Sequence, residues 1–187
     1  MRWPSLFLFL FLLTLVAAEL PIAVEAESFV AQRLTSKRAW KVFQGLGASG
    51  GKYVQVLPDT RTTHADKLIR GENFSNQAGE MAVLSYRVKF PAPGRYAVWV
   101  SAYSTGTEDN GIHVGINGTW PESGARMQWC EGKNAWTWAS KQRTAEVHCG
   151  VEGKIWLEVP TAGEHTVEFS MREDGFRFDR FELRKME

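Results

Sequence analysis

Three carboxylates near the two ends of the chain have the residue types and spacing that could bind a metal ion. Glu25 and Glu27 lie in a segment that is predicted to be extended, so both side chains point to one side of a strand and repel each other. Asp179 lies in an aromatic segment that is expected to be a core strand. If the first and last strands pair, the three acids converge, and a hard cation such as calcium would offset their repulsion and desolvation. The alternative is that they are the solvated faces of two edge strands.

A second group of charged residues precedes the last predicted strand. Arg172, Glu173 and Asp174, with Phe176 beside them, form a turn that could grip a ligand, because an arginine with two carboxylates can hold vicinal hydroxyls or an acidic sugar. The alternative is a solvated turn with a surface salt bridge of little energetic value. The polar loop at 105–111 is expected to add ligand contacts at the same rim, from Tyr103, Asp109 and Asn110.

Tryptophan is concentrated in one region, since four of the eight tryptophans lie between residues 119 and 153: Trp120, Trp129, Trp136 and Trp138. A sugar ring offers a face of C–H groups ringed by hydroxyls, so it binds a flat aromatic surface with polar groups nearby. Trp120 is counted among the candidate ligand contacts. The alternative is a satellite core beneath a long loop, which we expect to account for at least two of the four rings.

The same region contains the two cysteines of the chain, Cys130 and Cys149. In an oxidising compartment such a pair most often forms a disulfide, which here would stabilise the fold by roughly 3 kcal/mol. A metal or nucleophile site that includes His148 is the alternative, but no further ligand has suitable spacing.

Residues 1–18 have the pattern of a signal peptide. A positively charged start is followed by an apolar run and by small residues at Val16-Ala17-Ala18, so cleavage is expected after Ala18. The run is too short for a stable membrane anchor. Without this segment the basic and acidic residues are equal in number, which argues against nucleic acid or an anionic membrane as a partner. The remainder, 19–187, fits one exported domain, secreted or periplasmic.

The chain beyond residue 18 reads as short strands separated by turn residues. Segments 155–159 and 165–171 alternate apolar and polar residues, as half-buried strands do. The turns at 91–94 and 160–163 are expected to close β-hairpins. Other strands are expected at 22–29, 40–43, 52–56, 82–90, 95–100, 111–116 and in the last aromatic segment. Nine or ten such strands predict an all-β, antiparallel β-sandwich of jelly-roll type, with long loops at 59–79 and 119–153.

Several of these segments, in their order, resemble carbohydrate-binding modules of families 6 and 35. They are Glu25-Ala26-Glu27-Ser28-Phe29, Gly47-Ala48-Ser49-Gly50-Gly51-Lys52-Tyr53-Val54, Tyr86-Arg87-Val88, Pro93-Gly94-Arg95-Tyr96-Ala97-Val98-Trp99-Val100 and Phe178-Asp179-Arg180-Phe181. The resemblance implies a galactose-binding-like jelly roll with a structural calcium ion held by the paired glutamates and the late aspartate. It also implies a sugar site at the loop rim, on the turn before the last strand. The insert between the cysteines is longer than in the typical module.

The resemblance implies a non-catalytic protein that recognises a polysaccharide or oligosaccharide, with a polysaccharide-degrading enzyme as a candidate partner. Adjacent acids such as Glu173 and Asp174 do not provide the opposed carboxylates of a glycosidase, and no other catalytic motif is present. Two alternatives remain open: an envelope or adhesion module that binds a protein, and a small lyase or hydrolase that uses Glu173 or Asp174.

Overall fold

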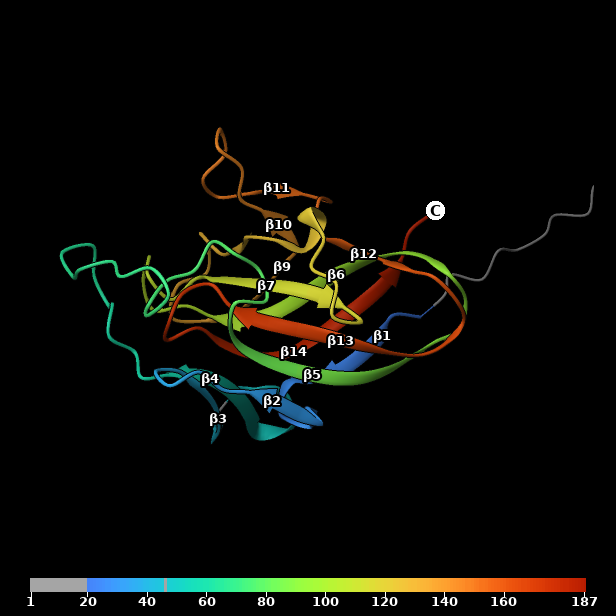
Figure 1. Cartoon of the computed structure of the whole chain (residues 1–187), viewed down its shortest axis with the longest axis horizontal. Helices are drawn as coiled ribbons and strands as arrows, with labels where there is room; N and C mark the ends of the chain where they lie inside the picture. Colours follow the sequence, from blue (N-terminus) through green and yellow to red (C-terminus); the bar gives the residue numbers. More distant parts are fainter. Residues whose placement is uncertain (1–19, 46) are drawn as a thin grey trace, which may run out of the picture.

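The computed structural model describes residues 20–45 and 47–187, and the predicted signal peptide at 1–18 lies outside the described residues. The described chain folds into two antiparallel β-sheets that pack face to face, with loops gathered at the ends of the strands (Figure 1). The prediction of an antiparallel β-sandwich is therefore confirmed. Three short 3-10 turns interrupt the strands: η1 (Ala26–Ser28), η2 (Ser49–Gly51) and η3 (Glu122–Gly124).

The first sheet is organised around two long strands, β6 (Gly94–Tyr103) and β14 (Arg177–Lys185). The outer edge of β6 pairs with both β12 and β9, and the outer edge of β14 pairs with both β4 and β1, while β3 adds to β4. These strands are β1 (Ile22–Glu25), β3 (Ala39–Gln44), β4 (Lys52–Leu57), β9 (Trp136–Ala139) and β12 (Trp156–Val159). The first and last strands of the described chain are thus neighbours, as the sequence predicted.

The second sheet has the order β11-β10-β8-β7-β13-β5-β2. Its members are β2 (Ala31–Arg33), β5 (Met81–Phe90), β7 (Gly111–Ile116), β8 (Met127–Gln128), β10 (Lys141–Gln142), β11 (Val151–Glu152) and β13 (Gly163–Met171). Figure 1 shows β10 and β11 projecting beyond the body of the sandwich, while β7, β13 and β5 lie side by side across its face.

The core lies between the two sheets and is rich in aromatic rings. In β5 the residues Tyr86, Val88 and Phe90 are buried and Arg87 and Lys89 are exposed, as the alternating pattern predicted. Tyr86 packs edge-on against rings from both sheets, one on β13 and one on β14. Each such side chain contributes about 1.5–3 kcal/mol of hydrophobic stabilisation relative to its exposed state.

The two predicted hairpins are wrong, because each turn carries the chain from one sheet to the other. Residues 91–94 join β5 in the second sheet to β6 in the first, and residues 160–163 join β12 to β13 across the same gap. Phe90 and Tyr96 therefore face each other across the core, with ring centroids 4.9 Å apart. Crossing between sheets buries the apolar faces of both strands, which pairing within one sheet would leave side by side on the same face.

Other differences concern the loops and the first strand. The extended segment predicted at 22–29 ends at Glu25, where η1 begins. The second long loop contains four short strands, β8 to β11. Cys130 and Cys149 form the predicted disulfide, with Cα atoms 5.4 Å apart. This bond ties the segment after β8 to the segment before β11, so the tryptophan-rich region is covalently closed.

Candidate functional site

The carboxylate of Asp179 reaches the first strand because of a β-bulge. The register between β14 and β6 shifts between Phe178 and Arg180, so Asp179 is the extra residue. Phe178 and Phe181 both lie in the core although they are three positions apart, an odd spacing that an unbroken strand would not allow. Arg180 is paired with Glu25 in β1. The bulge thus directs the Asp179 side chain away from the core, beside the first acidic residues.

The three predicted metal ligands lie around one turn, η2. Ser49 donates its backbone N–H to Asp179 Oδ1 at 2.7 Å and its hydroxyl to Glu25 Oε1 at 3.0 Å. Glu27 Oε1 lies 3.7 Å from the position that a Cβ atom on Gly50 would occupy. Gly50 has a φ of +59°, so this turn needs a residue that tolerates left-handed backbone. We call Glu25, Glu27 and Asp179 the turn cluster.

The electrostatics of the turn cluster are those of crowded, partly dehydrated carboxylates. Burial raises the pKa of Asp179, and the charge of Glu25 raises it further, while the N–H of Ser49 opposes both effects. Burial also raises the pKa of Tyr86 well above its ordinary value, with Glu27 as the second cause. Glu25 Oε2 and Glu27 Oε2 are buried without a hydrogen-bond partner. Unpartnered hard oxygen atoms of this kind match the donors that calcium prefers.

Within residues 20–45 and 47–187, no three histidine, cysteine or acidic side chains already form a metal-holding group. The turn cluster therefore has suitable donors but not a closed coordination shell. Glu25, Glu27 and Asp179 are the residues that would hold such an ion, through their carboxylate oxygens.

The predicted ligand grip before the last strand is not at an exposed rim, and this expectation is corrected. Arg172, Glu173, Asp174 and Phe176 are each no more than 4% exposed. Asp174 accepts hydrogen bonds from Arg38 at 2.7 Å and from the backbone N–H of Thr60 at 2.8 Å. The ring of Phe176 packs in the core, next to Trp129 and Phe178. These residues are buried because arginine and hydroxyl groups from distant segments compensate their charges.

Glu173 also has internal partners. It forms an ion pair with Arg172 and accepts the backbone N–H of Asn110 at 3.0 Å, while Arg172 donates to Gln128 at 3.1 Å. Asn110 accepts a hydrogen bond from Gln128. Of this network, Arg172 also lines a pocket, whereas the other members hold loops in place.

The remaining predicted contacts have mixed positions. Asp109 is buried and holds the loop at 104–106, where it accepts hydrogen bonds from Ser104 and Thr105. Tyr103 is half-buried, and its ring centroid lies 5.4 Å from that of Trp136. Trp120 is half-buried against Gly79 and Gly115, where a Cβ atom at either position would collide with the indole ring. Trp120 therefore packs on the outside of the sheet between two glycines.

A pocket of about 400 Å³ lies over the tryptophan-rich region, and we call it the tryptophan pocket. Its walls include Trp129, Trp136 and Trp138, with Gln128 and Lys141 as polar neighbours. Trp129 is buried and belongs to the main core, not to a satellite core, whereas Trp138 is 39% exposed. The Arg180 guanidinium carbon lies over the Trp138 ring, 5.3 Å from the ring centroid. The hollow thus combines flat aromatic surface with the exposed ion pair of Lys141 and Glu131, 3.3 Å apart, while the Gln128 amide is bound to Asn110 and Arg172.

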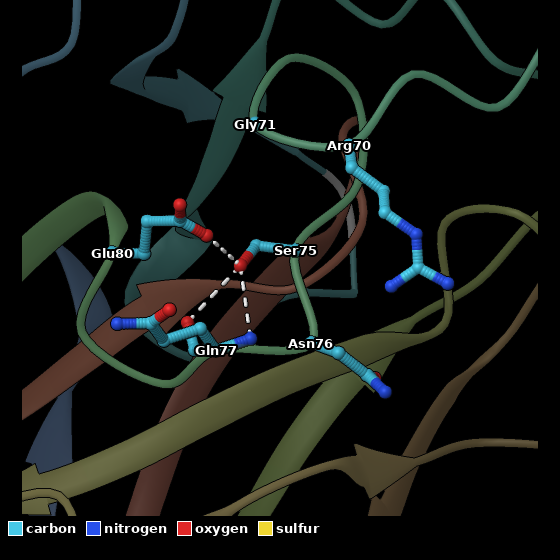
Figure 2. Close-up of a pocket in the computed structure, with 6 residues that line it drawn as sticks. All are labelled: Arg70, Gly71, Ser75, Asn76, Gln77 and Glu80. Carbon is cyan, nitrogen blue, oxygen red and sulfur yellow. Dashed lines mark hydrogen bonds between the residues drawn. The ribbon is translucent and has the colours of Figure 1, made fainter.

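A second pocket, of about 500 Å³, lies between the two long loops, and we call it the arginine pocket. Its walls contain Arg70, Arg126, Arg143 and Arg172 and no acidic residue. A neighbouring hollow of about 480 Å³ shares Arg70 and Asn76 with it. Figure 2 shows that the side chains of Arg70 and Asn76 lie on one side of the loop at 70–77, whereas Glu80 turns to the other side, toward Ser75.

A buried histidine joins the two loops beneath the arginine pocket. His113 on β7 contacts the Ser75 carbonyl at 3.2 Å through Nε2, and its Nδ1 accepts the Arg126 N–H at 2.9 Å. Burial lowers the pKa of His113 to about 3, and the nearby charges of Arg172 and Arg126 contribute in the same direction. The imidazole is therefore neutral at physiological pH, and its two contacts link the loop at Ser75 to the loop at Arg126. All six residues of β7 are buried, with Arg172 packed against Gly111 and Trp120 against Gly115.

Sequence reasoning missed Arg70, Arg126 and Arg143 because they come from separate loop segments. Arg126 and Arg143 become neighbours only through the β8–β10 pairing, where Arg143 donates its N–H to the Arg126 carbonyl at 2.9 Å. The available signal was the length of the two loops, which marked both as candidates for binding.

Solved structures show the same fold. The chain is similar to a family 35 carbohydrate-binding module from Clostridium thermocellum, with a TM-score of 0.50 and 20% identity over 87% of this chain and 98% of that one. It is also similar to a GH26-CBM35 β-(1,4)-mannanase from Podospora anserina, with a TM-score of 0.52 and 14% identity over 89% and 28% of the two chains. The predicted resemblance to these modules is confirmed for the fold.

The sequence model of the glycosyl hydrolase family 115 C-terminal domain matches residues 16–186, so this chain belongs to that family. The chain is also 56% identical, over 177 residues, to the uncharacterized protein P23 of Formosa agariphila. That alignment covers 87% of this chain and 43% of P23, so the chain spans less than half the length of its curated relative.

In the part of the chain that the structure describes, no helix has both the length and the apolar character needed to cross a membrane.

Proposed function

We propose that this chain is a non-catalytic carbohydrate-binding domain that is exported, stabilised by calcium and specific for a polysaccharide or its terminal sugars. The observation that carries the proposal is the tryptophan pocket. Trp138 offers an exposed ring, and the exposed ion pair of Lys141 with Glu131 supplies hydrogen-bonding groups beside it. A sugar needs this combination, because its C–H face packs on an aromatic ring while its hydroxyls need polar partners.

The positions of the candidate acids support a non-catalytic role. Glu173 and Asp174 are the residues that a small lyase or hydrolase would use, and each is buried in an ion pair with an arginine. A carboxylate that is buried and bound to an arginine is out of hydrogen-bond reach of a substrate in solvent, which a general acid or base must contact. The family of the chain, and the greater length of its relative P23, favour a role beside a polysaccharide-degrading enzyme.

The turn cluster supports a structural calcium ion. Glu25, Glu27 and Asp179 would supply carboxylate oxygens, two of which are buried without partners. The bound ion would neutralise their mutual repulsion and fix β1 against the bulge of β14. The disulfide and the signal-like segment at 1–18 favour export to an oxidising compartment.

The test is binding to a glycan array with and without calcium, followed by titration of a retained glycan against Trp138→Ala. We expect Trp138→Ala to weaken binding about tenfold, because it removes the ring that packs on the sugar. Trp99→Ala is the matched control, since Trp99 is half-buried on the same sheet and lies under Arg184 much as Trp138 lies under Arg180. An array without any retained glycan would contradict the proposal and favour a protein partner.

A further inference from the structure

The arginine pocket is a strongly positive hollow between the two long loops. Four of its lining side chains are arginines, and none is acidic. The chain as a whole is close to neutral, with a formal net charge of +1. The excess of positive charge is therefore local to the pocket and does not follow from the composition of the chain.

The positive charges in the pocket are only partly compensated by protein groups. Arg172 pairs with Glu173, and Arg126 pairs with Glu122, whose side chain is 73% exposed. No carboxylate of the described chain forms an ion pair with Arg70 or Arg143. Two full positive charges thus face the pocket without a carboxylate partner.

Arg172 supplies a second, independent sign of a binding site. Its side chain is 3% exposed, yet its Nε atom is buried without a hydrogen-bond partner, and the residue lines the pocket. Its guanidinium lies 5.0 Å from the centre of the Phe74 ring, and Phe74 also lines the pocket. A buried donor without a partner is unfavourable, so an acceptor that enters the pocket and reaches this atom would be stabilised.

Neighbouring groups respond to the same positive field. Burial lowers the pKa of Arg172, and the charges of Arg143 and Arg126 lower it further. Burial also lowers the pKa of His148, with Arg143 and Arg172 acting in the same direction. The pocket therefore favours an anion.

The arginine pocket and the tryptophan pocket adjoin each other along the β8–β10 pair. Gln128 and Lys141 line the tryptophan pocket, and Arg126 and Arg143, two positions further along each segment, line the arginine pocket. Two residues of extended chain span about 6.6 Å. Gln128, which lines the tryptophan pocket, also accepts a hydrogen bond from Arg172, which lines the arginine pocket.

We propose that the arginine pocket is a subsite for a negatively charged substituent, a carboxylate or a sulfate ester, on the glycan whose neighbouring sugar lies in the tryptophan pocket. The guanidinium groups of Arg70, Arg143 and Arg172 would hold its oxygens, because arginine matches the planar, bidentate geometry of such oxyanions. Phe74 and Leu68 would contact the apolar face of the same sugar. This inference rests on the proposed carbohydrate-binding function and adds the class of glycan.

The experiment compares charged polymers with their neutralised forms. Polygalacturonate and a sulfated galactan are titrated against the full chain by isothermal calorimetry, beside carboxyl-reduced polygalacturonate and desulfated galactan. We expect one or both charged polymers to bind and neutralisation to weaken that binding at least tenfold. Arg143→Gln and Arg70→Gln should each weaken binding of the charged form about tenfold and leave the neutral form unchanged, since each removes one charge-assisted contact.

Arg87→Gln on β5 is the matched control, because Arg87 is an exposed arginine that lines neither pocket. Melting curves of each variant check that the fold is kept. Equal affinity for charged and neutralised polymers, or equal losses in Arg143→Gln and Arg87→Gln, would overturn the subsite while the carbohydrate-binding function stands. Absence of binding to every polymer, together with an empty glycan array, would overturn both.

Discussion

Two groups of acidic residues in this molecule have their charges compensated in different ways. In the turn cluster the carboxylates contact a hydroxyl and a backbone N–H of Ser49, and two oxygens have no partner. In the group before β14, Asp174 Oδ1 also lacks a hydrogen-bond partner, but Glu173 and Asp174 each pair with an arginine, Arg172 and Arg38. The second group is more deeply buried than the first, yet its net charge is compensated within the protein.

The comparison shows that burial of an acid in this sandwich does not by itself indicate a metal site. Arg180 lies near the turn cluster, 3.3 Å from the Ser49 hydroxyl, but its ion pair is with Glu182 at 3.0 Å. No arginine forms an ion pair with the turn cluster in the described chain, although the charge of Arg180 opposes the rise in the pKa of Asp179. The proposed calcium ion would add the compensation that an ion pair supplies in the other group.

The largest effect is expected from breaking the internal pair. Arg38→Leu leaves Asp174 as an uncompensated buried carboxylate, so the free energy of unfolding should fall by about 3–5 kcal/mol in urea denaturation. The double variant Arg38→Leu with Asp174→Leu should recover much of this loss, because both charges are then absent. Glu158→Gln is the control, since the Arg95–Glu158 pair is exposed and should contribute less than about 1 kcal/mol. A small decrease in the free energy of unfolding of Arg38→Leu would show that the Asp174 carboxylate does not need the charge of Arg38 for its burial.

A smaller effect is expected from calcium at the turn cluster. At a calcium concentration one hundred times the dissociation constant, binding should stabilise the fold by about 2.7 kcal/mol relative to protein in chelator. Glu27→Gln and Asp179→Asn should each abolish most of the difference, whereas Glu164→Gln, at an exposed position of β13, should preserve it. Melting temperatures measured in calcium and in chelator test this. Identical curves for the wild-type chain would refute the ion and leave the arginine-paired group unaffected.

Much of the fold could be predicted from sequence because strand patterns are local. The alternation in β5 and β13 fixes which side chains face the core, and the pairing of β1 with β14 followed from the sandwich architecture. The hairpins were wrong for a physical reason. A turn sequence specifies that the chain reverses, but the sheet that receives the next strand depends on long-range packing, as between Phe90 and Tyr96.

The candidate site was only partly predictable for the same reason. The convergence of Glu25, Glu27 and Asp179 on one turn was expected from their positions in terminal strands, and calcium there remains a prediction. The turn at 172–174 was expected to be exposed because it is highly charged. Asp174 is buried because it pairs with Arg38, which lies 136 positions away in the sequence. No local sequence pattern predicts so distant a partner. The arginine pocket likewise exists only after β8 and β10 have paired.

The smallest effect concerns Asp59, the exception within the compensated region. Asp59 lies against Gly175, and burial raises its pKa from 3.8 to about 6, with the charges of Asp174 and Asp109 as further causes. Arg177 and Arg38 oppose this shift without cancelling it. The folded state therefore binds the proton more tightly than the unfolded state, so the stability contributed by this group is present below about pH 4 and is lost as pH rises to about 6.

Asp59→Asn removes the titratable carboxylate, and it tests whether Arg177 and Arg38 fail to compensate the charge of Asp59 fully. At pH 7.5 the variant should be more stable than the wild-type chain by about 1 kcal/mol, after solvent screening of a half-buried group is allowed for, and at pH 3.5 the gain should vanish. Asp66→Asn is a control of opposite sign, because hydrogen bonds from Thr63 and Thr62 lower the pKa of Asp66. That variant should lose stability at pH 7.5 relative to pH 3.5. The stability gained by Asp59→Asn is measured by urea unfolding at both pH values. If this gain did not change with pH, the arginines would compensate the Asp59 carboxylate as fully as Arg38 compensates Asp174, and the prediction would be wrong.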